Sequence, residues 1–271
     1  MKLKPIFLIT SGFLCGLAIL ALIIPFFSQF DPDTFNPELL GAASGPNRHH
    51  LFGTDELGRD ILIRCIYGSR ISLSVGIIAM SISIVIGTLY GLFAGYFGGY
   101  IDEFMMRIAD IFMALPTLFI ILIIQSLIPP NITNIMIIIG LFGWMGVARL
   151  VRAEVLRLKE HPFVIALKAK GLKNRWILFK HILPHTRNPI IVAAMLGMGN
   201  AILIESVLSY LGLGVQPPQA SWGNMLQNSL HYMREAPWIT FFPGILITLT
   251  VLSLNYIGDT IRSSLDPKEI Q

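Results

Sequence analysis

Charged residues are scarce in this 271-residue chain. Asp, Glu, Lys and Arg together make up 13% of the sequence, whereas hydrophobic residues make up 54%. An ordinary soluble domain has roughly a quarter of its residues charged. The composition therefore excludes an ordinary soluble domain and predicts a protein that is embedded in a bilayer.

Several chemical signatures are also missing. The only cysteines are Cys15 and Cys65, which excludes a disulfide framework or a CxxC metal knuckle, and both are expected to serve packing. The phosphate-binding pattern G-x-x-x-x-G-K-[ST] does not occur, so any ATP hydrolysis must take place on another chain. No catalytic cluster is evident, and we expect neither an enzyme nor a cofactor in this chain. The net charge of +4 predicts no nucleic-acid binding, because the excess lies beside a membrane.

Long apolar runs are abundant. Six of them approach the ~20 residues that a helix needs to cross the hydrocarbon core. They comprise residues 6–27, 71–97, 108–128, 132–148, 189–211 and 238–258. The first run is too long for a secretory signal core and is expected to be a retained helix. The predicted fold class is all-α, a polytopic membrane protein with six transmembrane helices.

Basic residues are distributed unevenly between the connecting segments. If both termini lie inside, the inner segments hold 15 Lys and Arg residues and the outer loops hold five. Ten of them fall between Arg149 and Arg187, a segment with only two acids. Since cytoplasmic loops carry the excess of Lys and Arg, we expect both termini in the cytoplasm, with Arg175 inside and Trp222 outside.

These patterns divide the chain into three parts. The parts are residues 1–70, with the first helix and an external segment, 71–258, the core transmembrane domain with a cytoplasmic loop at 149–187, and 259–271, a cytoplasmic tail. Within the external segment, Thr54 or Asp55 is positioned to cap a short helix that lies along the membrane surface.

Glycine and proline mark special positions within the spans. Gly87, Gly91 and Gly95 are spaced by four and let a neighbouring helix approach closely. That neighbour is either a helix of the same subunit or one of a second transmembrane subunit. Pro116 and Pro243 are expected to kink the third and sixth spans.

The segment from Arg149 to Arg187 is too polar to cross the membrane and is expected to fold on its cytoplasmic face. Pro162 suits the first turn of a helix that ends near residue 170, and Gly171 fits its C-terminal cap. Asn174 is positioned to cap a second helix that ends near Pro184.

The first of these helices forms a compact knob. Ala166 and Ala169 are small, Phe163 and Leu167 are apolar, and two lysines surround them. Nothing else in this chain is large and soluble enough to supply a socket, so the knob predicts a partner protein beneath the membrane. The alternative is that this basic loop binds anionic lipid headgroups.

Several segments resemble a known family of permeases. The run from Phe163 to Gly171, followed after ten residues by Ile182-Leu183-Pro184, is similar to the EAA loop of binding-protein-dependent ABC permeases. The usual Glu-Ala-Ala reads Ile165-Ala166-Leu167 here. Other segments resemble the dipeptide, oligopeptide and nickel branch of the family, namely residues 52–60, 68–73, Asp102 with Arg107, Asp110 and Pro116, residues 208–214, Trp222-Gly223, and residues 258–267.

The resemblance implies an ABC importer type I permease fold in a bacterial plasma membrane, and the second, C-type permease subunit of the importer. It implies a heterodimer with a sister permease, two partner subunits that bind ATP and Mg, and an extracellular or periplasmic solute-binding protein. Peptides are the expected solute, and nickel or a metal chelate is the alternative. The resemblance assigns coupling to the ATPase to Phe163, Ala166, Leu167, Ala169, Gly171, Leu183 and Pro184.

One glutamate and three histidines are the remaining polar candidates for a functional site. Glu205 lies inside the fifth span, where a charge costs roughly 2.5 to 3.5 kcal/mol, and is the candidate for the translocation path. The alternative is a hydrogen-bonded packing residue. His49-His50 and His231 are not expected to bind a metal, because adjacent histidines do not readily share one ion. An ion-coupled secondary carrier is the alternative of another class, but the prolines at 116 and 243 do not establish its usual internal repeat.

Overall fold

The computed structural model describes residues 5–27, 43–227 and 229–265, so part of the predicted external segment and residues 266–271 of the predicted tail lie outside the described ranges. Within these ranges the chain forms helices joined by turns, without a β-strand, which confirms the all-α prediction. The longer helices are α1 (Pro5–Phe27), α2 (Ile61–Phe97), α3 (Gly99–Ala114), α4 (Thr117–Leu127), α5 (Ile132–Lys159), α9 (Arg187–Tyr210) and α12 (Trp238–Leu265). The short segments are α6 (Pro162–Ala169), α7 (Asn174–Trp176), the π-helical η2 (Ile177–Ile182), α8 (Leu183–His185), α10 (Trp222–Met225) and α11 (Ser229–Tyr232).

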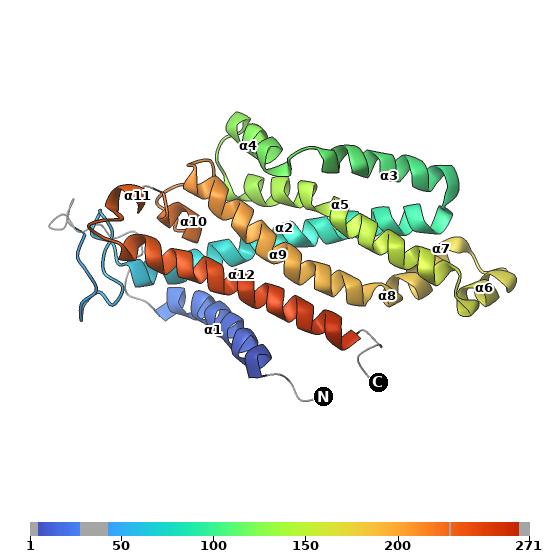
Figure 1. The fold of residues 1–271 in the computed structure, drawn as a ribbon, viewed down its shortest axis with the longest axis horizontal. Coiled ribbons are helices and arrows are strands. Elements are labelled where there is room, and N and C mark those ends of the chain that lie inside the picture. Colours follow the sequence, from blue (N-terminus) through green and yellow to red (C-terminus); the bar gives the residue numbers. More distant parts are fainter. Residues whose placement is uncertain (1–4, 28–42, 228, 266–271) are drawn as a thin grey trace.

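α2 lies at the centre of an elongated helix bundle (Figure 1). It packs along α5 and α9, and α12 packs on α9. α1 lies at the edge of the bundle against α2 and α12. The segments α6, α7 and α8 form one end of the molecule, while α10, α11 and the turns before α2 form the other.

The glycine stripe of α2 packs against α5 of the same chain. A Cβ atom on Gly91 would lie 2.4 Å from the carbonyl oxygen of Ala148, and one on Gly87 would lie 2.5 Å from that of Trp144. Gly95 also faces α5. Of the two neighbours considered for this stripe, the structure therefore places a helix of the same subunit there.

α2 begins well before the predicted second span. Asp60 caps the helix, because its carboxylate accepts a hydrogen bond from the backbone N–H of Ile63 at 2.9 Å. The prediction of a separate surface helix capped by Thr54 or Asp55 is wrong, since the expected helix is the first part of α2. The 37 residues of α2 extend about 55 Å, more than the ~30 Å of a hydrocarbon core. The predicted boundary after residue 70 thus falls inside a continuous helix.

The third predicted span, residues 108–128, is broken. α3 and α4 meet at Leu115 and Pro116 with a bend of 77°. Pro116 lacks an N–H to continue the helix, and Leu115 before it is extended. In the described ranges five helices are long and apolar enough to span a membrane, and the bent pair would make a sixth. The kink expected at Pro116 is therefore a full break, whereas α12 continues through Pro243.

Two helices extend past the predicted ends of their spans. α5 runs on from Ala148 to Lys159, and α12 runs on from Gly258 to Leu265. Both extensions are polar, so a prediction from hydropathy places the ends of these two helices too early. As a result, the first third of the predicted cytoplasmic loop is a rigid continuation of α5.

Candidate functional site

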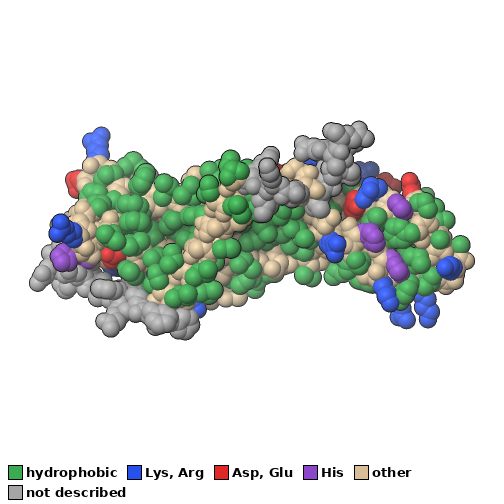
Figure 2. Space-filling model, turned by 90° about the horizontal axis from the view of Figure 1, so that it is seen from below, with side chains coloured by type: hydrophobic (Ala, Val, Ile, Leu, Met, Phe, Trp, Pro, Cys, Tyr) green, Lys and Arg blue, Asp and Glu red, His purple; other side chains and the backbone are tan. Residues whose placement is uncertain are grey.

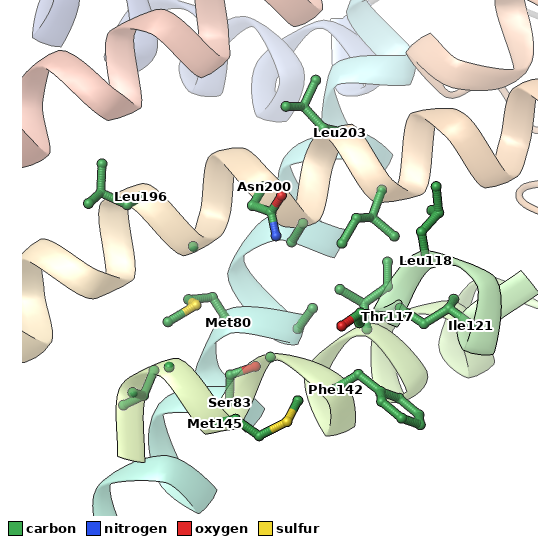
Figure 3. A pocket seen from close by; sticks show the side chains of 18 of the residues that line it. Met80, Ser83, Thr117, Leu118, Ile121, Phe142, Met145, Leu196, Asn200 and Leu203 are labelled. Carbon is green, nitrogen blue, oxygen red and sulfur yellow. The ribbon is translucent and has the colours of Figure 1, made fainter. Parts of the chain in front are cut away.

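A cavity of about 690 Å³ lies between α2, α5, α9 and the break that separates α3 from α4 (Figure 3). α2 contributes Met80 and Ser83, and α5 contributes Phe142 and Met145. The first turns of α4 also line the cavity, beginning with Thr117. The break at Pro116 thus shapes the site, because it brings the start of α4 to the cavity wall.

The wall is largely apolar and carries the polar side chains of Ser83, Thr117 and Asn200. The Ser83 hydroxyl donates a hydrogen bond to the carbonyl of Gly140 at 2.8 Å and so serves the contact between α2 and α5. Asn200 projects from α9 toward Met80 and Thr117 (Figure 3). In the part of the chain that the structure describes, neither Asn200 nor Thr117 has a side-chain hydrogen-bond partner. Both are available to a solute.

The cavity opens along one face of α9. The residues that α9 contributes recur every three or four positions, which places them on a single helical face. Leu196, Leu203 and Val207 on this face are 36%, 42% and 38% exposed. In a chain that spans a bilayer, such an exposed apolar strip faces either lipid or another transmembrane helix.

Glu205 lies on α9 outside the cavity wall. Its carboxylate is fully buried, with Oε1 accepting a hydrogen bond from Ser209 at 2.7 Å and Oε2 accepting one from Ser72 at 3.4 Å. The Ser72 hydroxyl in turn accepts a bond from the backbone N–H of Trp222 at 3.2 Å. This geometry fits the packing alternative, and a role for Glu205 in translocation stays a prediction.

The predicted coupling segment is anchored by one side of α6. Val164 is buried, and Phe163, Leu167 and Leu183 pack as half-buried side chains against the same apolar cluster. That cluster also includes residues of α2, α5 and η2. The segment is therefore joined to the ends of two long helices.

The other side of α6 is open. Ile165, Ala166 and Ala169 are exposed there, and Pro184 is exposed on α8. Of the residues expected to form the knob, the structure presents the two alanines outward, whereas Phe163 and Leu167 hold the helix in place.

Gly171 ends α6 in the left-handed conformation, with φ of 73°. Its N–H donates a hydrogen bond to the carbonyl of Lys168 at 2.9 Å, and the N–H of Leu172 donates to the carbonyl of Leu167 at 3.3 Å. These bonds form a Schellman cap. The glycine cap predicted at residue 171 is confirmed.

Asn174 does not cap the second helix. Lys173 occupies the position before α7, and no side chain caps that helix. The Asn174 Oδ1 instead accepts a hydrogen bond from the hydroxyl of Tyr96 at 2.9 Å. Because Tyr96 belongs to the last turn of α2, this bond fastens the coupling segment to the central helix.

Ion pairs connect α3 with α5 near the same end. Arg152 donates to both carboxylate oxygens of Asp102, with the Nη2 to Oδ2 distance at 2.6 Å. Arg149 of α5 pairs with Asp110, which lies about two turns after Asp102 in α3. A bidentate arginine pair fixes geometry as well as charge, so the first half of the broken span is held against α5.

At the opposite end, the motif at residues 52–60 forms a turn packed on α12. The Asp55 carboxylate accepts backbone N–H bonds from Leu57 and Arg59 and the Nε–H of Arg59 at 2.7 Å. Trp238 Nε1 donates to the carbonyl of Thr54 at 3.1 Å. These residues build a compact cap on the end of α12.

His50, one of the residues considered for metal chemistry, contacts the acid that caps α2. His50 Nδ1 lies 2.9 Å from Asp60 Oδ2. Among the described residues, no group of three or more His, Cys, Asp or Glu side chains is arranged to hold a metal ion. Cys65 is buried as a packing residue would be, whereas Cys15 is exposed on α1.

Comparison with known proteins gives consistent matches. A family model described as "Binding-protein-dependent transport system inner membrane component" matches residues 87–271. The oligopeptide transport system permease protein OppC of Bacillus subtilis is 42% identical over 259 residues, 93% of this chain and 84% of the relative. The dipeptide transport system permease protein DppC of Alkalihalophilus pseudofirmus is 41% identical over 250 residues, 92% of this chain and 82% of the relative.

A solved structure shares the arrangement of helices. It is the MetNI methionine ABC transporter in an inward facing conformation, with a TM-score of 0.62 and 16% identity over 76% of this chain and 98% of that chain. At this identity the likeness concerns the fold alone.

Proposed function

The chain belongs to the family of binding-protein-dependent transport system inner membrane components, and from this membership we propose that it is the permease subunit of an ATP-driven importer of di- or oligopeptides. The relatives named above are peptide permeases, which supports peptides over nickel or a metal chelate. Membership in this family leaves the ion-coupled carrier without support.

The observation that carries this proposal is the cavity that opens along α9. One subunit supplies a wall with free polar groups at Asn200 and Thr117, and a sister permease facing α9 would close the path. The backbone of a peptide brings amide groups that pair with such side chains. Its apolar side chains suit the remainder of the wall. The chain therefore forms one half of the translocation path in a heterodimer.

The exposed side of α6 is the proposed contact with the ATP-binding subunits, which would bind ATP and Mg. Ala166 and Ala169 allow close approach, and the cap at Gly171 fixes the turn that follows. Phe163 and Leu167 tie the helix to the apolar cluster shared with α2 and α5. A displacement of α6 would thus reach the long helices that line the cavity.

The end with α6, α7 and α8 is the proposed cytoplasmic end. Lys, Arg and His side chains gather there, and hydrophobic side chains cover the middle of the molecule (Figure 2). The start of α1 and the end of α12 point toward the same end (Figure 1). The opposite end, capped by α10 and the turn at residues 52–60, would receive the solute-binding protein.

Replacement of Ala166 by Arg tests the proposal. A long charged side chain on the exposed face of α6 should block docking, abolish uptake of labelled dipeptides, and remove the ATP-binding subunits from purified complexes or uncouple their hydrolysis. As a control, Ser264→Arg adds the same side chain at the exposed end of α12. It should leave both dipeptide uptake and copurification of the ATP-binding subunits unchanged. Normal uptake and normal copurification with Ala166→Arg would remove α6 from the mechanism.

A further inference from the structure

A second hollow, of about 830 Å³, lies on α7 and η2. Basic and aromatic side chains line it, namely Lys173, Arg175, Trp176, Phe179 and Lys180. The proposed contact with the ATP-binding subunits uses the exposed side of α6 and assigns no role to these side chains.

The hollow is positively charged. No Asp or Glu occurs between Glu160 and Glu205, so the surrounding segment has no acid of its own. Lys173, Arg175 and Lys180 are exposed, and within the described ranges none of them is paired with a carboxylate. The Lys180 ammonium lies 4.8 Å from the centre of the Trp176 ring, which holds it over the hollow's aromatic wall. The hollow therefore suits an anion.

Aromatic rings connect the hollow to the outer surface of α2. Phe179 meets Phe93 edge-on at 6.5 Å between ring centres, and Phe93 is parallel to Phe97 at 6.1 Å. All these rings are exposed on the surface of the chain. Because α2 is long and apolar enough to span the membrane, and aromatic side chains collect where membrane meets water, these exposed rings suit a place at the membrane surface beside the hollow.

We propose that this hollow binds the headgroup of an anionic phospholipid. The phosphate would lie among Lys173, Arg175 and Lys180, and the acyl chains would lie along Phe93 and Phe97. A bound lipid would hold α7 and η2 at the membrane surface and so steady the joint between α6 and α9. The inference rests on the membrane-spanning fold and does not depend on the identity of the transported solute.

Photoreactive lipids test this site in the complete transporter. The complex is placed in nanodiscs with phosphatidylglycerol or phosphatidylcholine analogues that carry the same crosslinker beside the headgroup. The segment of this chain that becomes crosslinked to lipid is then identified by proteolysis and mass spectrometry. Phosphatidylglycerol should label residues 171–180, and phosphatidylcholine should not. Equal labelling of that segment by both lipids, or no labelling there, would overturn the proposal.

A charge-neutralised variant sharpens the test. Combined Lys173→Gln, Arg175→Gln and Lys180→Gln should lower labelling on the order of a hundredfold, because each cation near an anionic surface changes affinity about fivefold. The control neutralises three other exposed cations at the same end, Lys170, Arg187 and Arg262, and should keep the label. If the first variant keeps its lipid label but loses the ATP-binding subunits, the hollow is a protein contact and the lipid assignment fails.

Discussion

Asn200 and Glu205 lie five residues apart on α9 and meet different surroundings. At 3.6 residues per turn, five positions rotate a side chain by about 140°, so the two point to different faces. Asn200 faces the open cavity, whereas Glu205 is buried among serine hydroxyls of α2 and α9. Whether a polar residue inside a span lines a cavity or packs against a neighbouring helix therefore depends on the helical face it occupies.

Replacement of Asn200 by Leu should weaken solute binding. The variant loses a free amide on the cavity wall, and one hydrogen bond is worth about 0.5 to 1.5 kcal/mol. The KM for labelled dipeptide uptake should rise about two- to tenfold at unchanged expression. Asn255→Leu on α12, away from the cavity lining, is the matched control. An unchanged KM in the Asn200 variant would show that this side chain does not meet the solute.

Replacement of Glu205 separates packing from translocation. Glu205→Gln keeps an oxygen acceptor for the Ser209 hydroxyl, whereas Glu205→Leu leaves the buried hydroxyls of Ser72 and Ser209 without their acceptor. Each unsatisfied buried group costs about 1 to 3 kcal/mol. The Leu variant should lose thermal stability in detergent, and the Gln variant should fold and transport normally. A stable Gln variant that fails to transport would instead return Glu205 to the solute path.

Among the elements, the contact between α2 and α5 depends on the absence of side chains on one face of α2. Gly91→Ala would place a Cβ atom 2.4 Å from the Ala148 carbonyl oxygen, so the helices must move apart. Overpacking of this kind costs about 1 to 3 kcal/mol and should lower the melting temperature of the purified subunit. Gly244→Ala on α12 meets open space and serves as the control. Equal melting temperatures for both variants would contradict the close approach of α2 and α5.

The sequence predicts these elements best where the signal is local. Apolar runs locate the spans, and the Schellman cap at Gly171 follows from the residues around it. The ends of helices are predicted less well. Polar helical turns extend α2 back to Ile61 and α5 on to Lys159, and these turns carry no hydrophobic signal. The full break at Pro116 is also missed, since a proline inside a span can kink a helix, as expected, or end it.

The cavity needs tertiary contacts that no single segment reveals. Met80, Phe142 and Asn200 come from three distant helices, and only packing brings them together. The sequence shows Asn200 as an amide within an apolar run. It does not show that this side chain lies on the face of α9 that lines the cavity. Likewise, Phe163 and Ala166 were expected in one knob, yet the first packs inward and the second outward.

At the scale of the whole molecule, two polar ends enclose an apolar middle (Figure 2). The end with α6 to α8 is the richer in Lys and Arg, and cytoplasmic segments carry such an excess. This bias favours an orientation with α6 to α8 in the cytoplasm, and the start of α1 and the end of α12 point toward that same end. The orientation in the membrane is therefore open to a chemical test.

Single cysteines at Arg175 and Gln219 should react oppositely with an impermeant thiol reagent. Both side chains are exposed, at the end with α6 and at the end with α10 respectively, so packing does not limit their labelling. Trp222 is unsuitable as the external probe, because it is fully buried and its indole donates a hydrogen bond to the carbonyl of Cys65. Cys15 and Cys65 are first replaced by alanine.

In intact cells the reagent should label the cysteine at 219, and the one at 175 should react only after the membrane is opened. Permeabilised cells supply the control, since both positions must label there if both are exposed. Labelling at 175 from outside, with 219 protected, would invert the orientation. The surface of α6 would then face away from any cytoplasmic ATPase, and the coupling proposed for Ala166 would fall with it.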